Sequence, residues 1–257
     1  MSKYLALVMS LLVVVVFASS ALSYKAVEVK GGATVKGVIK FNGTVPAEEV
    51  AAADETQKAC QKAERTPKFI ITDFRVRNAV VFINSPKNGK PVSKDTVVDL
   101  TIKKCGMEQL VNIGFVGGKF RFKNEDDILH TIQLKLWLAN HNKVSSRPLT
   151  DGATIYNIAL PNKGKQIDKL IKNFHRYQED TGVIRVTSNT DPALRGYVFV
   201  SDHPYVALTD KNGEFTMDNL PPGEYTLTVW HEGLGLQNKT LKVALNETTQ
   251  VEVIYEK

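Results

Sequence analysis

Cysteine is scarce in this chain, and the common catalytic motifs are absent from its sequence. The 257 residues include two cysteines, Cys60 and Cys105, with no Cys-x-x-Cys pair. There is no Gly-x-Ser-x-Gly, no His-Glu-x-x-His and no phosphate-binding loop, so serine hydrolase, zincin and nucleotide-binding chemistry lack their usual residues. We therefore expect a protein that is not an enzyme.

A membrane-length apolar run is also missing. The apolar segment Leu5–Ala18 is about 14 residues long, short of the roughly 20 that a membrane-spanning helix needs. Lys3 precedes it and Ala21-Leu22-Ser23 supplies a small-x-small cleavage site, so residues 1–23 are predicted to be a secretion signal, with an uncleaved anchor as the alternative. We expect an exported protein, periplasmic or extracellular, with no membrane span after cleavage.

The charge is positive but scattered. Lys and Arg number 33 against 27 Asp and Glu, which gives a formal net charge of +6. The lysines are distributed along the chain and form no long basic stripe. This distribution is typical of a solvated surface, and we expect no nucleic-acid partner.

Apolar and polar residues alternate with a period of two through most of the chain. The alternation predicts strands at residues 34–41, 78–84, 131–138, 183–186, 196–200, 214–217, 225–230 and 251–255. Two segments, Ala47–Glu64 and Gln166–Phe174, have the composition or the spacing of helices. The sequence thus predicts an all-β protein of the sandwich family with small helical segments.

The two cysteines are expected to form one disulfide. Export favours this state, and the bridge would close a loop of about 45 residues. The alternative is a pair of metal-binding or reactive thiols, which their wide separation makes the weaker interpretation.

The last 60 residues contain a pattern of turns and strands. Thr209-Asp-Lys-Asn-Gly213-Glu-Phe215 is followed by Leu220-Pro-Pro-Gly223-Glu-Tyr225-Thr-Leu227, with Asn212-Gly213 as a predicted hairpin turn and Phe215 packed inward. These residues resemble a carboxypeptidase-regulatory-like (transthyretin-like) sandwich. Its first two strands match residues 32–39 and 78–82, so the resemblance implies a split domain formed by residues 24–94 and 201–257.

A second resemblance lies inside the first. Phe120–His130 is predicted to be a strand, a turn capped by Asp126 and Asp127, and a histidine. It is similar to the first ligand strand of a blue-copper (cupredoxin) domain, which the resemblance places at residues 95–200.

The second ligand segment of a cupredoxin is a Cys-x-x-His-x-x-Met loop before a Gly-Tyr strand. Here the loop is Ser188-Asn-Thr-Asp191-Pro-Ala-Leu194-Arg, and Gly196-Tyr197 follows. Ser188, Asp191 and Leu194 replace the thiolate, imidazole and thioether ligands. We expect a degenerate domain that has lost its blue-copper site.

The whole arrangement resembles a family of exported bacterial methylamine-utilization or plastocyanin-like proteins. Further matching pieces are Cys105, Asp202-His203-Pro204-Tyr205 and Trp230-His231-Glu232-Gly-Leu-Gly235. In copper-competent members the first histidine and the Cys/His/Met loop would bind copper. Only His130 carries over to this chain.

The histidines offer two weaker candidate metal sites. In the first, His141 or His175 would join His130 as a ligand, and the carboxylate of Asp191 would be a ligand better matched to zinc or Cu(II) than to Cu(I).

The second candidate is the pair His203 and His231 at the seam between the two domains. Tyr205, Trp230 and Glu232 would add an aromatic wall and an acid, and together they form a possible ligand or partner surface. The alternative is that both histidines are structural hydrogen-bond partners and that Trp230 packs in the interdomain core.

These features predict a non-enzymatic exported binding or assembly protein with no cofactor. Its partner would be a periplasmic or cell-surface protein or, by analogy of fold, a carbohydrate. The alternative is a periplasmic copper or zinc carrier, or an electron-transfer accessory, with a rebuilt histidine site. The carbohydrate hypothesis requires that Tyr205 and Trp230 be exposed.

Overall fold

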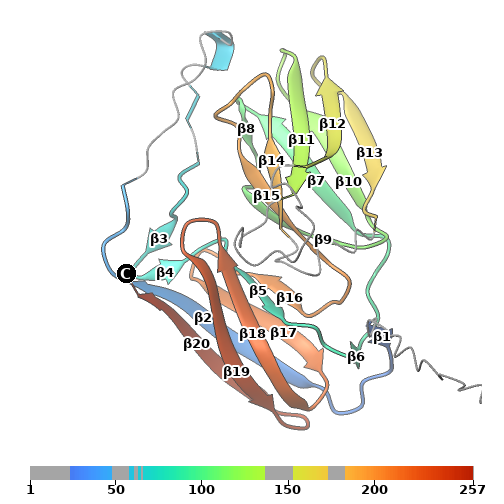
Figure 1. The fold of residues 1–257 in the computed structure, drawn as a ribbon, viewed down its shortest axis with the longest axis vertical. Coiled ribbons are helices and arrows are strands. Elements are labelled where there is room, and N and C mark those ends of the chain that lie inside the picture. Colours follow the sequence, from blue (N-terminus) through green and yellow to red (C-terminus); the bar gives the residue numbers. More distant parts are fainter. Residues whose placement is uncertain are drawn as a thin grey trace, which may run out of the picture.

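The computed structural model describes residues 24–47, 58–60, 63–64, 66–136, 153–172 and 183–256. Strands dominate these residues, and their one helix is a 3-10 turn, η1 (Lys58–Cys60). The strands form two sandwiches (Figure 1), which confirms the all-β prediction. The predicted secretion signal lies outside the described residues, and so do His141 and His175. No helix within the described ranges is long and apolar enough to cross a membrane.

The split sandwich is built from the strands of residues 33–42, 71–83 and 206–256. One sheet has the order β16 (Val206–Leu208), β5 (Val80–Ile83), β18 (Gly223–His231), β19 (Gly235–Val243). The other has the order β17 (Glu214–Leu220), β2 (Ala33–Asn42), β4 (Arg75–Val76), β3 (Ile71–Thr72), and β20 (Thr248–Glu256) also pairs with β2. The alternation in β2 places Val35, Ile39 and Phe41 in the core, as predicted.

The strands of the inserted sandwich, within residues 97–136, 154–170 and 183–201, lie in the chain between β5 and β16. Its first sheet has the order β13 (Gln166–Leu170), β10 (Lys119–Asn124), β7 (Val97–Lys103), β8 (Gly106–Met107). Its second has the order β12 (Thr154–Leu160), β11 (His130–Leu136), β14 (Val183–Thr187), β15 (Gly196–Ser201), β9 (Val111–Phe115). Two short strands, β1 (Lys25–Ala26) and β6 (Asn88–Gly89), pair apart from both. The domain boundaries at residues 94 and 200 stay a prediction.

An apolar cluster joins the two sandwiches. Trp230 of β18 packs edge-on against Tyr197 of β15, with the ring centroids 5.4 Å apart. Phe82 and Phe199 meet in the same cluster at 4.6 Å. The seam is therefore a packed core, as in the alternative interpretation of Trp230.

The helix predicted at Gln166–Phe174 is wrong over its described part. Residues 166–170 form the edge strand β13, which pairs with β10. Asp168 lies directly opposite Arg121, and the guanidinium donates two hydrogen bonds of 3.1 Å to the carboxylate. Cross-strand pairing decides the structure here, because a segment this short fits a helical and an extended pattern equally well. Of the helix predicted at 47–64, the structure describes only fragments, including η1.

The turn at Asn212-Gly213 is real but does not form a hairpin. It connects β16 to β17, and these strands belong to opposite sheets of the split sandwich. Gly213 has φ +68° and its amide donates to the carbonyl of Asp210 at 3.0 Å. The tight turn therefore carries the chain from one layer to the other.

Candidate functional site

His130 is the first residue of β11, and its side chain is fully buried. Its Nε2 lies 3.0 Å from Oδ2 of Asp126. That carboxylate also accepts the backbone amides of Lys104 and Cys105 at 2.7 and 2.8 Å. Partial burial acts to raise the pKa of Asp126, but these amides and the His130 ring outweigh it and lower the pKa. An ionised carboxylate only accepts, so Nε2 of His130 is the donor.

The side chain of Asn124 holds the turn before His130. Oδ1 of Asn124 accepts the amide of Asp126 at 2.8 Å, and Nδ2 donates to the carbonyls of Ile128 and Leu160. Asp126 caps the neighbouring β7–β8 turn instead of its own. The prediction that Asp126 caps its own turn is therefore wrong, because that carboxylate reaches across to another segment.

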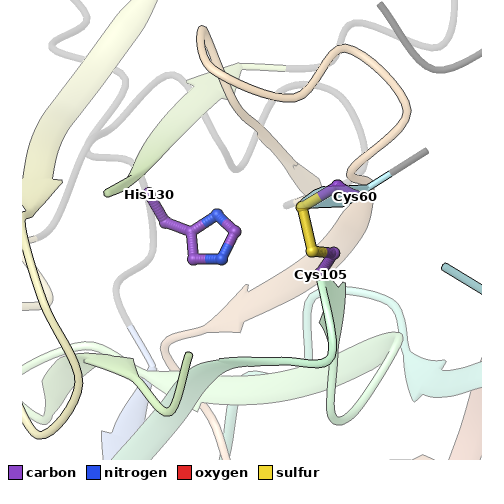
Figure 2. A group of neighbouring side chains, drawn as sticks. All are labelled: Cys60, Cys105 and His130. Atoms are coloured by element: carbon purple, nitrogen blue, oxygen red, sulfur yellow. A yellow bond between two sulfur atoms is a disulfide. The ribbon is translucent and has the colours of Figure 1, made fainter. Parts of the chain in front are cut away.

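The predicted disulfide between Cys60 and Cys105 is confirmed. Its position was not predicted: the two sulfur atoms and a ring nitrogen of His130 all lie within 4.8 Å of one another. Figure 2 shows the imidazole facing the disulfide. No other group of three His, Cys, Asp or Glu side chains in the described part of the chain is arranged to hold a metal ion.

The loop after β14 is closed by hydroxyl groups and backbone. Oγ of Ser188 lies 3.0 Å from the hydroxyls of Thr131 and Thr190, and it accepts the amide of Asp191 at 3.2 Å. Oδ1 of Asp191 accepts the amide of Ala193 at 3.1 Å. Each of these bonds stabilises the turn locally.

Leu194 completes the loop with an apolar side chain, 2% exposed, in the core of the inserted sandwich. A blue-copper ion needs a thiolate and two imidazoles. The loop offers a hydroxyl, a carboxylate and an isobutyl group, and both sulfur atoms of the cysteines are in the disulfide. The residues present therefore do not fit a blue-copper ion.

His203 and His231 are both buried and both bound to the backbone. In each, Nδ1 accepts the amide of the residue two positions later, Tyr205 or Gly233, at 3.2 Å. Burial lowers the pKa of both imidazoles to about 4, and at His231 the nearby charge of Lys68 adds to this. Both rings are consequently neutral at physiological pH.

The two histidines have different aromatic neighbours. His203 packs against Tyr24 and Tyr205, whereas His231 stacks on Phe69 at 6.1 Å. Neither belongs to the group of three potential metal ligands formed by Cys60, Cys105 and His130.

The predicted partner surface is buried. Tyr205 is 0% exposed, Trp230 2% and Glu232 8%. The hydroxyl of Tyr205 donates to the carbonyl of Asn219 and accepts the amide of Lys90, both at 2.9 Å. These three residues therefore form no ligand surface, and the carbohydrate hypothesis loses the exposed aromatic rings that it requires.

One family model matches part of the chain. Residues 181–255 match the family model of the carboxypeptidase regulatory-like domain. The match begins just before β14 of the inserted sandwich and ends in β20 of the split one. No curated protein sequence matches the chain.

Several solved structures are similar to this chain at low TM-scores and low sequence identity. A reduced amicyanin is 15% identical, with a TM-score of 0.29, over 47% of this chain and 98% of its own. Auracyanin A from Chloroflexus aurantiacus is 14% identical, with a TM-score of 0.29, over 41% and 98%. The copper-containing nitrite reductase of Thermus scotoductus SA-01 is 12% identical, with a TM-score of 0.28, over 55% and 28%.

The strand topology and the family model together describe an all-β protein of two sandwiches in which residues 181–255 match a carboxypeptidase regulatory-like domain. The resemblance to methylamine-utilization proteins stays a prediction.

Proposed function

We propose that this chain is an exported, non-enzymatic binding or assembly protein whose cupredoxin-like sandwich acts as a rigid scaffold without a blue-copper centre. The observation that supports this most is the hydrogen-bonded loop at residues 188–195. Its polar groups serve the turn and its leucine fills the core, so the loop stabilises the sandwich where a cupredoxin would bind its ion.

The packed seam supports a scaffold role as well. Trp230 and its neighbours join the two sandwiches through a continuous apolar contact. Such a contact fixes the orientation of one domain on the other, and an assembly protein needs this to present a defined surface. With Tyr205 and Trp230 buried, the proposal retains a periplasmic or cell-surface protein as the partner.

Metal carriage is the second candidate, and one observation favours it. Nδ1 of His130 is buried and has no hydrogen-bond partner among the described residues, and the ring lies beside two sulfur atoms. His203 and His231 offer a weaker case, because each already uses Nδ1 to accept a backbone amide.

A gain-of-function series tests the scaffold proposal. The exported protein, oxidised and offered Cu(II), should show none of the intense visible absorption of a copper–thiolate bond. Restoring the three ligands in the variant S188C/D191H/L194M should produce that absorption, with His130 as the fourth ligand. The same triple variant carrying His130→Ala is the matched control and should stay colourless. Strong copper–thiolate absorption from the unmodified chain would contradict the proposal.

A further inference from the structure

The disulfide and His130 form a compact cluster of three potential metal ligands. Cys60 comes from η1, Cys105 from the β7–β8 turn and His130 from the start of β11. Their ligand atoms all lie within 4.8 Å of one another, and all three side chains are buried. Three separate segments of the chain therefore converge on one point, with the imidazole directed at the sulfur atoms (Figure 2).

The protonation pattern of His130 leaves one nitrogen available. Nε2 donates to the Asp126 carboxylate, so Nδ1 carries the lone pair in the neutral ring. No hydrogen-bond donor reaches Nδ1 from the described residues, although the side chain is 0% exposed. Buried polar atoms normally have a partner, and a carboxylate on the far nitrogen is the usual support of a metal-bound histidine. This second observation points to a ligand at Nδ1.

We propose that reduction of the Cys60–Cys105 disulfide converts this cluster into a binding site for a thiophilic d10 ion, Zn(II) or Cu(I). The two thiolates and Nδ1 of His130 are the ligands, a donor set that suits both ions. In the disulfide the sulfur atoms carry no negative charge, so the oxidised cluster does not bind the ion. Sulfur ligands of tetrahedral zinc lie about 3.8 Å apart, so the two side chains need to separate by only about 2 Å.

The redox step balances as a thiol–disulfide exchange. A dithiol reductant supplies two electrons and two protons; the Cys60–Cys105 bond breaks, two S–H bonds form, and the reductant becomes a disulfide. The ion then displaces both thiol protons, while His130 binds as the neutral ring. Asp126 acts as a positioning residue, because its carboxylate fixes the proton on Nε2 and the orientation of the imidazole.

This site gives the second candidate function, metal carriage, a specific set of ligands. It does not depend on the scaffold role, because the copper–thiolate absorption of the oxidised protein tests that role separately. The experiment uses the exported chain, purified without a tag. One half is reduced with dithiothreitol and freed of it under nitrogen. Both halves are titrated with Zn(II), and with Cu(I), against a coloured competing chelator. We expect one ion per reduced chain and substoichiometric metal on the oxidised chain.

Four variants locate the ligands. Reduced His130→Ala should bind roughly 100-fold more weakly, and C60S/C105S should show no thiolate-to-metal absorption with Co(II) as the probe. Asp126→Asn should keep that absorption and the stoichiometry but lose roughly 10–100-fold in affinity, and Asp126→Glu should recover part of the loss. His203 is another buried histidine and lies outside the cluster. His203→Asn is therefore the control and should bind as the unmodified chain does.

Three results would overturn the proposal. The first is a reduced chain that keeps its β-sheet circular dichroism but binds neither ion. The second is equal binding before and after reduction, or equal binding by His130→Ala. The third is loss of the β-sheet signal on reduction, because the site requires the folded cluster.

Discussion

Lowering the pH from 8 to 5 is expected to destabilise this protein through two buried histidines. His203 and His231 each have a pKa of about 4 in the folded chain, against an ordinary value of 6.5. Between these values the unfolded chain binds a proton at each histidine and the folded chain does not. Stability is therefore complete above pH 6.5 and falls as the pH drops toward 4.

The size of the effect follows from the same two values. At pH 5 the difference in proton binding destabilises the folded chain by about 2 kcal/mol for each histidine, and this loss levels at about 3 kcal/mol each well below pH 4. Together they remove about 4 kcal/mol between pH 8 and pH 5, which is a large share of a typical domain's stability. Both side chains are almost fully buried, so solvent screening does not reduce the figure much.

Urea unfolding followed by circular dichroism at pH 8 and pH 5 measures this loss. Asparagine places an acceptor oxygen close to the position of Nδ1, so His203→Asn and His231→Asn can keep the bonds to the amides of Tyr205 and Gly233. Each variant is less stable overall because it leaves a void. Its pH-dependent loss should nevertheless be smaller by about 2 kcal/mol than that of the unmodified chain. An unchanged pH-dependent loss in both variants would refute the reasoning.

Three further substitutions have predicted losses in the free energy of unfolding. C60S/C105S removes the closure of a 45-residue loop and should cost about 4 kcal/mol in urea unfolding; a loss below about 1 kcal/mol would show that the cross-link restrains little of the unfolded chain. Trp230→Ala empties the seam and should cost about 3–5 kcal/mol, with more frequent proteolytic cuts between the sandwiches; an unchanged cleavage pattern would argue against a coupled seam. Gly213→Ala adds a Cβ 2.7 Å from a backbone carbonyl at φ +68° and should cost more than about 1 kcal/mol. The control is Gly164→Ala, at φ +78° with no atom within 4 Å of the added Cβ. This substitution adds backbone strain but no clash, so an equal loss of stability in both variants would contradict the predicted clash at Gly213.

Local patterns were sufficient for much of the fold. The alternation at Val35, Ile39 and Phe41 predicted the buried face of β2, and the strand, turn and histidine at residues 120–130 were found in that order. The pattern failed at β13, where Ile167 and Leu170 fit helical spacing but the strand gains its partners from β10. The β or helix propensity of a few neighbouring residues does not include the stabilisation that a cross-strand partner adds.

The strands β7, β9, β12 and β19 were not predicted either. They include Val97–Lys103, whose Val98 and Leu100 are buried in alternation. Such a pattern is visible in the sequence, so this omission reflects the weakness of short alternating runs as a signal.

The arrangement of the candidate site could not be predicted from residue spacing, because it is formed by contacts between distant segments. The disulfide followed from the cysteine count and the predicted export, but its place beside His130 required the folding of segments 45 and 25 residues apart. Asp126 was identified only as a turn residue, whereas its carboxylate reaches the amides of the β7–β8 turn and the histidine ring. The absence of thiolate, imidazole and thioether at Ser188, Asp191 and Leu194, by contrast, was evident from residue identity alone.

Metal content of the oxidised, exported protein tests the account most directly. The untagged chain is incubated with copper and with zinc, passed through a desalting column, and its metal is counted by mass spectrometry. The account predicts substoichiometric metal, because the loop after β14 holds no soft ligand and both sulfur atoms are in the disulfide. Near-stoichiometric copper that disappears in His130→Ala would contradict it.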